Sequence, residues 1–308
     1  MTKIEAFLKK EDDVSLANLG HLSDAKTVAF TVDVEEWFQV GAFETVFDRS
    51  EWPSLESRVE LQTHAVLALL RDLQIQATFF CLGWVAERLP DLIKTIADAG
   101  HEVACHGMDH RRLFTMSPLE FERDVKAAKN LLEAASGKPV RGYRAPSFSL
   151  TSEVWWVYKI LADAGFDYSS SLYPVKTDHY GENSAPRGPF HPHSADSLLE
   201  IPMTVCDLPL KRVPASGGGY FRLLPYFLSR HFMRAGPAQA GAPGIFYMHP
   251  WEMDTEQPYI SRAPLLSRFR HYTGQSRLPK KLTALAKDFK FGRMDDIYSS
   301  LLNNSPRA

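Results

Sequence analysis

The sequence predicts an α/β fold in which parallel strands alternate with helices. Strand-like apolar runs recur about seven times along the chain, and helical patterns separate most of them. Polar residues capable of chemistry follow directly after several of these runs. Such an order is typical of parallel βα units rather than of a β-sandwich. With 308 residues, the chain is long enough for one large domain, for two ordinary ones or for a single α/β barrel.

The first strand is predicted at residues 27–35, where the side chains alternate in character. One face carries Val28, Phe30, Val32 and Val34, and the other carries Ala29, Thr31, Asp33 and Glu35. Because successive side chains of a strand point to opposite faces, the apolar set is expected to pack against helices. The two acids are then expected at the end of the opposite face.

The later units repeat the order of helix and then strand. Helical spacing of apolar residues over 59–73, 89–99 and 118–135 precedes strands predicted at 75–81, 102–105 and 140–144. Gly100 marks one helix end, and Ser136 with Gly137 marks another. Further strands are predicted at 165–170, 198–203 and 244–249, with a helix over 152–164.

Long connections and a C-terminal block complete the predicted organisation. Two connections are expected to line an active site: residues 174–197, which are rich in Pro, His and Gly, and the turn at 216–219. Long structureless connections in compact domains are usually functional. After residue 254, a helix is predicted from the spacing of Leu282, Leu285, Ala286 and Phe289. We therefore expect an N-terminal segment (1–26), a barrel-like domain (27–254) and a C-terminal extension packed on that domain (255–308).

Composition and charge limit the class of protein. Hydrophobic residues at 44% and charged residues at 23% describe a globular chain, and no apolar run approaches the roughly 18 residues of a membrane-spanning helix. The net charge of −2 offers no general attraction to nucleic acid. Residues 255–308 are basic, with 10 Lys and Arg against 4 Asp and Glu. That segment could meet an anionic glycan or make peripheral contact with a membrane surface, and the plainer interpretation is a solvated charged face.

The N-terminus and the cysteines predict the cellular location. Residues 1–13 mix Lys and acids and lack the apolar core of a secretory signal. Cys81, Cys105 and Cys206 are an odd number without close spacing, which argues against a disulfide framework. We expect buried thiols, a reducing compartment and a cytoplasmic protein. The oligomeric state is left open.

The residues suited to chemistry gather at predicted strand ends, which is where parallel α/β folds place their sites. Asp33 and Glu35 end the first strand and share a face, and Glu36 follows. Small Ala29 and Thr31 share the same face. This favours a functional pair of acids, and the alternative is a pair of helix-capping or solvated acids.

Two histidines follow the strand predicted at 102–105. His106 and His110 are separated by three residues, and Gly107 offers a turn between them. If the segment turns helically, both imidazoles can converge on one cation, and histidine with a carboxylate is a usual zinc set. The alternative is a pair of ordinary surface or core histidines.

Two further strand ends each carry a basic side chain. Arg144 precedes Ala145 and Pro146, and the proline forces Ala145 toward extended geometry. An arginine there can hold a carboxylate with two hydrogen bonds, and a surface salt bridge is the alternative. His249 ends the apolar strand at 244–249, which suggests a histidine presented to a pocket; a core histidine bonded to a backbone carbonyl stays open.

Together these motifs resemble the polysaccharide deacetylase family, also called the NodB-homology or carbohydrate esterase family four domain. The resemblance covers roughly residues 27–255 and rests on residues 31–33, 77–80, 100–103, His106-Gly107 with His110, residues 143–146 and the strand ending at His249. A subgroup associated with bacterial exopolysaccharide biosynthesis is more similar still. It shares Asp-Val-Glu-x-Trp-Phe, here residues 33–38, and a C-terminal extension like residues 266–272.

The resemblance implies a distorted (β/α) barrel of about seven parallel strands with a C-terminal helical extension. It implies a hydrolase that removes N-acetyl groups from glycans with a metal-bound water. His106 and His110 match metal ligands of the family, and zinc is the expected single divalent metal. Asp33 matches the catalytic base, and Arg144 matches the residue that orients this base. His249 matches the general acid, and the backbone N–H of Ser147 matches the oxyanion donor.

The sequence departs from the family pattern at two motifs. The family has a second aspartate, a metal ligand, where Val34 stands here. Strand alternation returns Glu35 to the face of Asp33, so Glu35 is predicted as the replacement ligand, whereas Glu36 would face away unless the strand has ended. Residues 167–171 replace the fourth motif, so the partner that tunes His249 is open.

The leading prediction is a cytoplasmic, metal-dependent N-deacetylase acting on an amino sugar of a bacterial glycan or of its lipid-linked precursor. One alternative is a cyclic amide hydrolase, because allantoinase-like relatives share the fold and also depart from the double aspartate. Another is a glycan-binding module with a decayed site, suggested by Val34. Aromatic surfaces for sugar stacking are expected from Trp37, Tyr220 and Trp251, with ordinary packing as the alternative.

Overall fold

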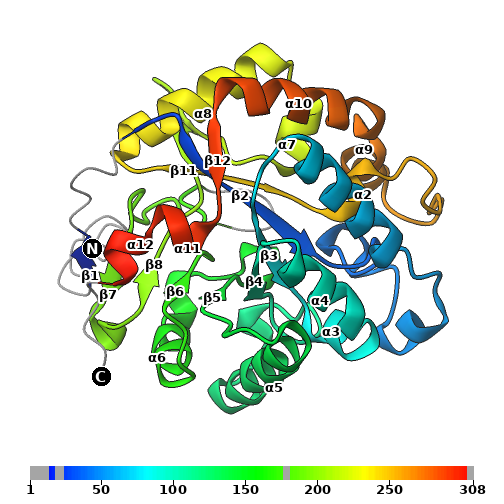
Figure 1. Ribbon diagram of the computed structural model, residues 1–308, viewed down its shortest axis with the longest axis horizontal. Coiled ribbons are helices and arrows are strands. Elements are labelled where there is room, and N and C mark those ends of the chain that lie inside the picture. The colour runs from blue at the N-terminus through cyan, green and yellow to red at the C-terminus, as the bar shows by residue number, and fades with distance from the viewer. Residues whose placement is uncertain (1–13, 18–23, 176–180, 304–308) are drawn as a thin grey trace.

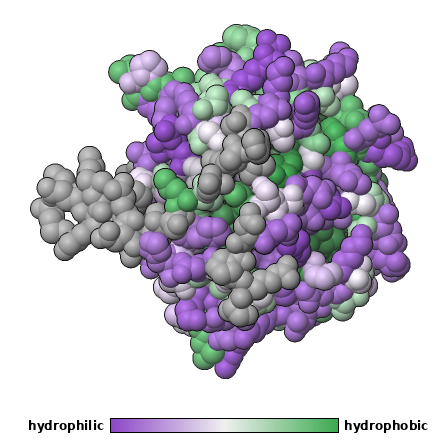
Figure 2. All heavy atoms as spheres, turned by 60° about the vertical axis from the view of Figure 1, so that its left-hand side comes forward, coloured by the Kyte–Doolittle hydropathy of each residue, from purple (hydrophilic) through white to green (hydrophobic). Residues whose placement is uncertain are grey.

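The structure is a computed structural model that describes residues 14–17, 24–175 and 181–303 (Figure 1). Most of the predicted N-terminal segment (1–26), and residues 176–180 of the predicted connection 174–197, lie outside the described residues. Among the helices of the described part, none has the length and apolar character that crossing a bilayer requires. The face seen in Figure 2 is covered mainly by hydrophilic residues, with hydrophobic ones in small groups.

One curled sheet forms the centre of the described fold, and helices surround its strands in Figure 1. The strands follow the order β1-β7-β8-β6-β5-β4-β3-β2-β11, and β12 also pairs with β2. Their bounds are β1 Val14–Leu16, β2 Thr27–Val34, β3 Thr78–Cys81, β4 Glu102–Cys105, β5 Gly142–Tyr143, β6 Tyr168–Ser169, β7 Phe190–Pro192, β8 Leu199–Glu200, β11 Gly244–Met248 and β12 Lys290–Gly292. A separate antiparallel pair joins β9 (Val205–Asp207) to β10 (Arg212–Pro214). Because the strand order has two ends, the sheet is a half-barrel and not a closed barrel.

The seven predicted strands are present as β2, β3, β4, β5, β6, β8 and β11. Neighbouring members of this set pair in parallel. The predicted α/β fold class is therefore confirmed. Three of the strands, β5, β6 and β8, have only two residues each and are shorter than predicted. At one end of the sheet, β1 and β7 add antiparallel pairs.

The helices begin and end where the local sequence supplies caps, as α5 (Pro118–Ser136) illustrates. Ser117 and Glu120 form a capping box around its first turn, and Gly137 ends it with a left-handed φ of 66°. Its buried residues recur every three or four positions, which is the spacing of one helix face. The other helices are α2 Val59–Asp72, α3 Gly83–Arg88, α4 Pro90–Asp98, α6 Trp156–Asp163, α7 Gly218–Leu223, α8 Tyr226–Ala240, α9 Leu265–Tyr272, α10 Leu278–Asp288, α11 Met294–Ile297 and α12 Ser299–Leu302.

Strand β2 lies inside the sheet and ends where the predicted acids stand. On one edge, β11 pairs with residues 28–32; on the other edge, β12 pairs with residues 27–29 and β3 with residues 31–34. The predicted alternation is confirmed, because the side chains of the two faces pack in different core clusters. The larger cluster holds Val28, Phe30, Val32 and Val34, and the second holds Ala29.

The C-terminal residues supply a strand as well as helices. β12 lies outside the predicted elements, because the apolar spacing of Leu282, Leu285 and Phe289 extends the helical pattern too far. Phe289 has extended backbone, with φ −132° and ψ 156°, and α10 already ends at Asp288. Residues 290–292 therefore belong to the sheet itself, while the boundary between residues 254 and 255 stays a prediction.

The amino end of the sheet contains a buried carboxylate at the start of β4. Glu102 accepts hydrogen bonds from the Thr78 hydroxyl at 2.6 Å and from the Tyr168 hydroxyl at 2.9 Å. The backbone N–H of Asp295 lies 3.3 Å from the same carboxylate, and that of Met294 donates to the Thr78 hydroxyl at 2.8 Å. Burial, followed by the charge of Asp295, raises the pKa of Glu102 to about 8. This cluster attaches α11 to the sheet.

Candidate active site

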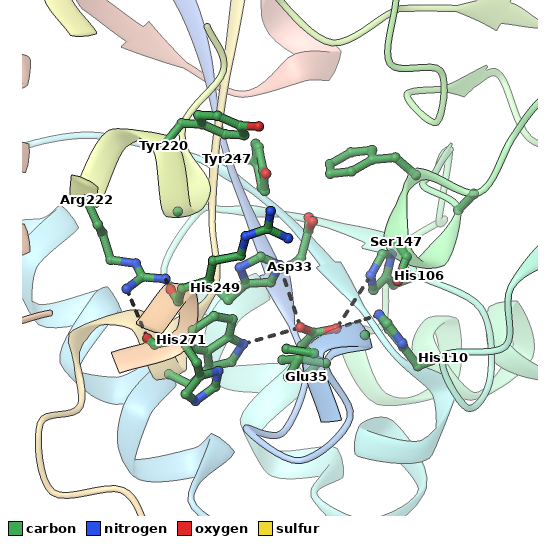
Figure 3. A pocket seen from close by; sticks show the side chains of 18 of the residues that line it. Asp33, Glu35, His106, His110, Ser147, Tyr220, Arg222, Tyr247, His249 and His271 are labelled. Carbon is green, nitrogen blue, oxygen red and sulfur yellow. Dashed lines mark hydrogen bonds and ion pairs between the residues drawn. The ribbon is translucent and has the colours of Figure 1, made fainter. Parts of the chain in front are cut away.

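The predicted site residues meet at the carboxyl ends of the parallel strands (Figure 3). Asp33 lies at the end of β2 and Glu35 just beyond it, His106 follows β4 and His249 follows β11. A cavity of about 310 Å³ opens between them. Its lining includes Asp33, Glu35, His106, His110, Ser147, Tyr220, Tyr247, His249 and Trp251.

Three side chains of the cavity form a group that could hold a metal ion. The ligand atoms of Glu35, His106 and His110 lie within 4.8 Å of one another. Glu35 Oε2 is 2.8 Å from His110 Nε2 and 3.9 Å from His106 Nε2, yet this buried oxygen accepts no hydrogen bond. Close ligand atoms without hydrogen bonds among them fit a shared cation.

A backbone carbonyl selects the tautomer of His106. Its Nδ1 lies 2.9 Å from the carbonyl oxygen of Arg144, and a carbonyl can only accept a hydrogen bond. Nδ1 therefore carries the proton, and Nε2 presents its lone pair toward Glu35. A histidine bonded in this way at one nitrogen and free at the other is the usual form of a metal ligand.

The loop that carries the two histidines is not helical, which corrects the expected helical turn. Gly107 has a φ of 79° and His110 a φ of 59°, both in the left-handed region. Asp124 holds the intervening residues by accepting a hydrogen bond from the backbone N–H of Met108 at 3.0 Å. The chain folds back on itself, and the two imidazole centroids are 5.4 Å apart.

Burial and nearby charges give Glu35 and His106 the protonation states that metal ligands need. Burial alone would raise the pKa of Glu35, but the positive charges of His110 and His249 outweigh it and lower the pKa to about 2. Burial lowers the pKa of His106 to about 4. At neutral pH the carboxylate is ionised and the imidazole of His106 is neutral, as metal ligands must be.

Arg144 is fully buried and holds Asp33 in place. Its Nη1 donates to Asp33 Oδ1 at 2.6 Å and to the Thr31 hydroxyl at 2.7 Å. The guanidinium also lies 4.0 Å from the ring centre of Phe80. Asp33 is only 1% exposed, but it lines the cavity. One carboxylate oxygen is therefore bonded to the arginine, while the side chain stays next to the predicted metal ligands.

The segment at residues 167–171 supports Arg144 and does not reach His249. The carbonyl oxygen of Ser170 accepts a hydrogen bond from Arg144 Nε at 3.1 Å. The hydroxyl of Ser171 accepts one from the backbone N–H of Ala145 at 2.9 Å. Ala145 has the extended backbone predicted from the following proline, with φ −70° and ψ 132°. Residues 167–171 thus hold the loop that follows β5 in place through hydrogen bonds.

His249 has a partner that the sequence analysis did not identify. Its Nδ1 donates to Glu252 Oε1 at 2.8 Å, and Arg222 Nε donates to Glu252 Oε2 at 2.5 Å. Burial would lower the pKa of His249, but Glu35 and then Glu252 raise it to about 9. His249 Nε2 lies 3.6 Å from Glu35 Oε1. The imidazole is therefore protonated at neutral pH and turns its second nitrogen toward the metal-binding group.

A local sequence signal could have pointed to Glu252. The acid stands three residues after His249 and caps the 3-10 helix at Pro250–Met253, because its carboxylate also accepts the backbone N–H of His249 at 3.1 Å. An acid three residues beyond a helix N-cap is the pattern of a capping box. No comparable signal exists for Arg222, which comes from α7.

The three predicted aromatic residues have different positions. Trp37 is 2% exposed, lies outside the cavity lining and packs among phenylalanines, so the ordinary-packing alternative describes it and the expected sugar surface is corrected. Trp251 lines the cavity, but both faces are covered, by His249 at 4.9 Å and His271 at 4.3 Å between ring centroids. Its edge donates to Glu35 Oε1 at 3.3 Å. Tyr220 is 40% exposed at the cavity and keeps a surface open to a ligand.

Ser147 lines the cavity, and its role as oxyanion donor stays a prediction. It lies within the short 3-10 helix Pro146–Phe148 and has a left-handed backbone, with φ 53° and ψ 25°. The first backbone N–H groups of a helix have no partner within that helix. The N–H of Ser147 is such a group, so it is suited to donate to a ligand.

Comparison with known families assigns two parts of the chain. The family model for polysaccharide deacetylase matches residues 41–168, which include His106, His110 and Arg144. This part of the chain is therefore similar to polysaccharide deacetylases. A second model, for a domain of unknown function (DUF3473), matches residues 170–299, which include His249 and Glu252. The cavity draws its side chains from both matched parts and from residues 33–40, which precede them.

Curated relatives are similar over about a third of the chain. A peptidoglycan deacetylase of Helicobacter pylori is 31% identical over 112 residues, which are 35% of this chain and 36% of the relative. A peptidoglycan-N-acetylglucosamine deacetylase of Bacillus cereus is 32% identical over 104 residues, 34% and 47% of the two chains. A chitooligosaccharide deacetylase of Sinorhizobium fredii is 38% identical over 85 residues, 27% and 40%. The matches span less than half the length of these relatives.

Solved structures share the fold. A candidate polysaccharide deacetylase from Mycobacterium smegmatis has a TM-score of 0.62 at 20% identity, and the likeness covers 96% of both chains. Puue allantoinase has a TM-score of 0.58 at 15% identity, again over 96% of both chains. The half-barrel sheet with its surrounding helices is therefore an architecture that both of these proteins share.

Of the two acids after Asp33, Glu35 belongs to the site and Glu36 to the start of α2. Val34, at the position of the family's second aspartate, points into the larger core, and Glu35 joins His106 instead. The carboxylate of Glu36 accepts hydrogen bonds from the Ser57 hydroxyl and from the backbone N–H that precedes α2, the latter at 3.0 Å. β2 ends at Val34, one residue before the predicted end, yet Glu35 still faces the cavity.

Proposed function

We propose that the protein is a metal-dependent hydrolase that removes the N-acetyl group from an amino sugar of a glycan. The observation that carries the proposal is the convergence of three features in one cavity. They are the Glu35, His106 and His110 group, the arginine-bound carboxylate of Asp33, and the protonated His249. The match of residues 41–168 to the polysaccharide deacetylase family model supports the same reaction class.

The residues fit a divalent cation, and we propose zinc. One carboxylate and two imidazoles are a usual zinc donor set, and the orphaned Glu35 Oε2 together with the tautomer of His106 supports it. A cation held there would polarise the acetamido carbonyl and lower the pKa of a water in the cavity.

The proposed steps use the chain's own groups as base and oxyanion donor. Asp33 accepts a proton from the water that attacks the carbonyl carbon, while Arg144 keeps the carboxylate oriented through Oδ1. The carbonyl oxygen gains negative charge as the new C–O bond forms. The N–H of Ser147 donates to that oxygen in the proposed geometry.

His249 acts on the leaving side in this proposal. The C–N bond breaks toward nitrogen, and His249 Nε2 donates its proton to the departing amine. Glu252 fixes the imidazole by accepting from Nδ1, which keeps Nε2 facing the cavity. The products are acetate and a free amino group on the sugar, so atoms and charges balance with one water consumed.

The test combines metal analysis with acetate release from N-acetylated oligosaccharides. Wild type should bind about one zinc per chain and release acetate, and chelation should abolish turnover. Asp33→Asn keeps the shape of the side chain but cannot take the proton, so it should retain the metal and lose about 10²- to 10⁴-fold in rate. A metal-loaded Asp33→Asn variant that releases acetate at nearly the wild-type rate would remove Asp33 as the base.

The same assay separates the two alternatives. A wild type that is inactive on every N-acetylated glycan but opens a cyclic ureide would replace the proposal with the cyclic amide hydrolase. A wild type that holds no metal and performs neither reaction, yet binds glycans, would support the glycan-binding module.

We also propose the finer context of the reaction. The substrate is a glycan of exopolysaccharide biosynthesis or its lipid-linked precursor, supported by the motif at residues 33–38. The compartment is the cytoplasm, supported by Cys81, Cys105 and Cys206, which are all free and buried. A fusion to a reporter that is active only in the cytoplasm tests the location, and assays on the polymer against its precursor test the substrate.

A further inference from the structure

The apolar face of α9 is turned toward solvent, which reverses the usual arrangement of a surface helix. Leu265 is 76% exposed, Leu266 55% and Phe269 56%. At about 100° per residue, these three side chains fall within an arc of about 100°. His271, which is 2% exposed, lies on the opposite side of the helix and packs against Trp251. We call Leu265, Leu266 and Phe269 the α9 apolar face.

The α9 apolar face is bordered by arginines. On the same helical projection, Arg268 lies beyond one edge of the arc and Arg270 beyond the other. Arg268 also donates to the hydroxyl of Tyr259, whose side chain is 64% exposed, at 2.8 Å. An exposed apolar strip with basic residues on both flanks is the pattern of a helix that lies in the plane of a bilayer surface.

The charge around the helix complements an anionic surface. Residues 255–287 contain seven Lys and Arg residues and a single acid, Glu256. The side chain of Arg262, just before α9, is 58% exposed. Each basic residue near a negatively charged lipid surface adds to the attraction, and the apolar side chains add burial among the lipids.

The α9 apolar face borders the mouth of the active-site cavity. Arg270 lines that cavity, and Leu266 lies one helical turn before it on the same side of α9. Leu223 of α7 also lines the cavity and is 37% exposed. Arg222 ties α7 to the end of α9, because it donates to backbone carbonyls of residues 270, 271 and 273. A surface bound by α9 would therefore lie beside the entrance.

We propose that the α9 apolar face and its flanking arginines bind the surface of an anionic phospholipid bilayer and hold the cavity mouth at that surface. Phe227 at the start of α8 is a further exposed apolar side chain, at 67%. The binding is peripheral and reversible, since one eight-residue helix supplies the apolar contact. The proposal concerns where the protein acts and does not depend on the chemistry proposed above.

Co-sedimentation with vesicles tests the proposal. The probes are vesicles of phosphatidylglycerol mixed with phosphatidylcholine, compared with pure phosphatidylcholine, at low and high salt. Wild type should bind the anionic vesicles and lose binding as salt rises. The triple variant Leu265→Ser, Leu266→Ser, Phe269→Ser should bind at least about tenfold more weakly. The matched control Leu61→Ser, Leu119→Ser changes exposed leucines of α2 and α5, 63% and 55% exposed, and should bind like wild type.

Each other outcome overturns the proposal. Wild type that stays in the supernatant has no such surface, and equal binding to both vesicle types excludes the anionic partner. A control variant that loses as much binding as the triple variant excludes α9 as the location. A wild-type dimer that the triple variant converts to a monomer, without vesicle binding, assigns the face to a second copy of the chain. The triple variant and wild type should have the same unfolding temperature and should release acetate from a water-soluble substrate at the same rate. If neither releases acetate, the proposed chemistry fails, and the vesicle assay still tests membrane binding.

Discussion

The two ends of the sheet both contain a buried glutamate, and the two residues are in opposite situations. At the amino end, both oxygens of Glu102 accept hydrogen bonds, from Thr78 and Tyr168. At the carboxyl end, Glu35 Oε2 accepts none, although two imidazoles lie beside it. A satisfied buried carboxylate joins segments of the chain. An unsatisfied one that lines a cavity beside two imidazoles is equipped to take a ligand.

Their pKa values diverge for the same reason. Burial acts on both groups and raises the pKa of a carboxyl. At Glu102, burial and the charge of Asp295 raise the pKa to about 8. At Glu35, burial is outweighed by His110 and His249, and the pKa falls to about 2. The comparison shows that partners, and not depth, decide whether a buried acid of this fold is charged at neutral pH.

Removing the charge of Glu35 should have the largest effect. Glu35→Gln keeps the size of the side chain but loses an anionic ligand, so metal affinity should fall by at least about 100-fold, the upper end of what changes around metal ligands typically cost. Elemental analysis after dialysis, with acetate release on the same samples, measures it. Glu36→Gln is the matched control, because the Glu36 carboxylate caps the start of α2 and should leave metal binding intact. Loss of metal in Glu36→Gln alone would show that the assignment of the two acids is reversed.

Removing the charge of Glu252 should have an intermediate effect. Glu252→Gln no longer holds the imidazolium of His249, so kcat should fall about 10- to 100-fold while KM and metal content stay unchanged. Asp254→Asn is the control, because it breaks a neighbouring ion pair, with Arg58 at 2.7 Å, that does not touch His249. Equal losses in the two variants would mean that the segment matters only for packing.

Replacing the titratable carboxyl of Glu102 should change how stability depends on pH and leave the chemistry alone. Its pKa is raised in the folded protein above the ordinary value of 4.5, so the folded state binds this proton more tightly. The stabilisation is therefore fully present below about pH 4.5 and is lost as pH rises through about 8. Between pH 5 and pH 8, Glu102→Gln should therefore lose less stability than wild type, and its unfolding temperature should change less. Parallel unfolding curves for wild type and variant at pH 5 and pH 8 would contradict the raised pKa. Asp295, Arg293 and Arg141 are the other charged groups near Glu102, and all three stay in place in the variant.

The sequence predicted the strands and the carboxyl-end site because both follow from local pattern. Alternation over residues 27–35 placed Asp33 and Glu35 on one face, and the cavity contains both. The position of His106 directly after an apolar strand likewise depends on nearest neighbours. Family resemblance then added the roles of these residues, which the sequence pattern alone does not contain.

The features that the sequence did not predict depend on contacts between residues far apart in the chain. Arg222 reaches Glu252 from α7, and His271 covers Trp251 from α9, so neither contact has a signature in the local sequence. Trp37 and Trp251 have the same residue type at comparable places after a strand, and only tertiary packing shows that neither presents a free face. β12 escaped for a different reason, because a three-residue strand directly after a helix shares the apolar spacing of that helix.

The position of β2 between β3 and β11 affects how the chain folds while it is synthesised. The contact between Thr31 and Phe246 joins residues 215 positions apart. The ribosome adds about 5 to 20 residues per second. One edge of β2 therefore has no partner strand for roughly 10 to 40 s, until β11 has been synthesised. During that time, a run rich in valine offers unpaired backbone groups to any neighbouring nascent chain. Asp33 lies near the end of this run and Glu35 just beyond it, and charges placed there oppose such mispairing. The two acids that line the cavity of the finished protein thus also oppose mispairing of β2 before the cavity exists.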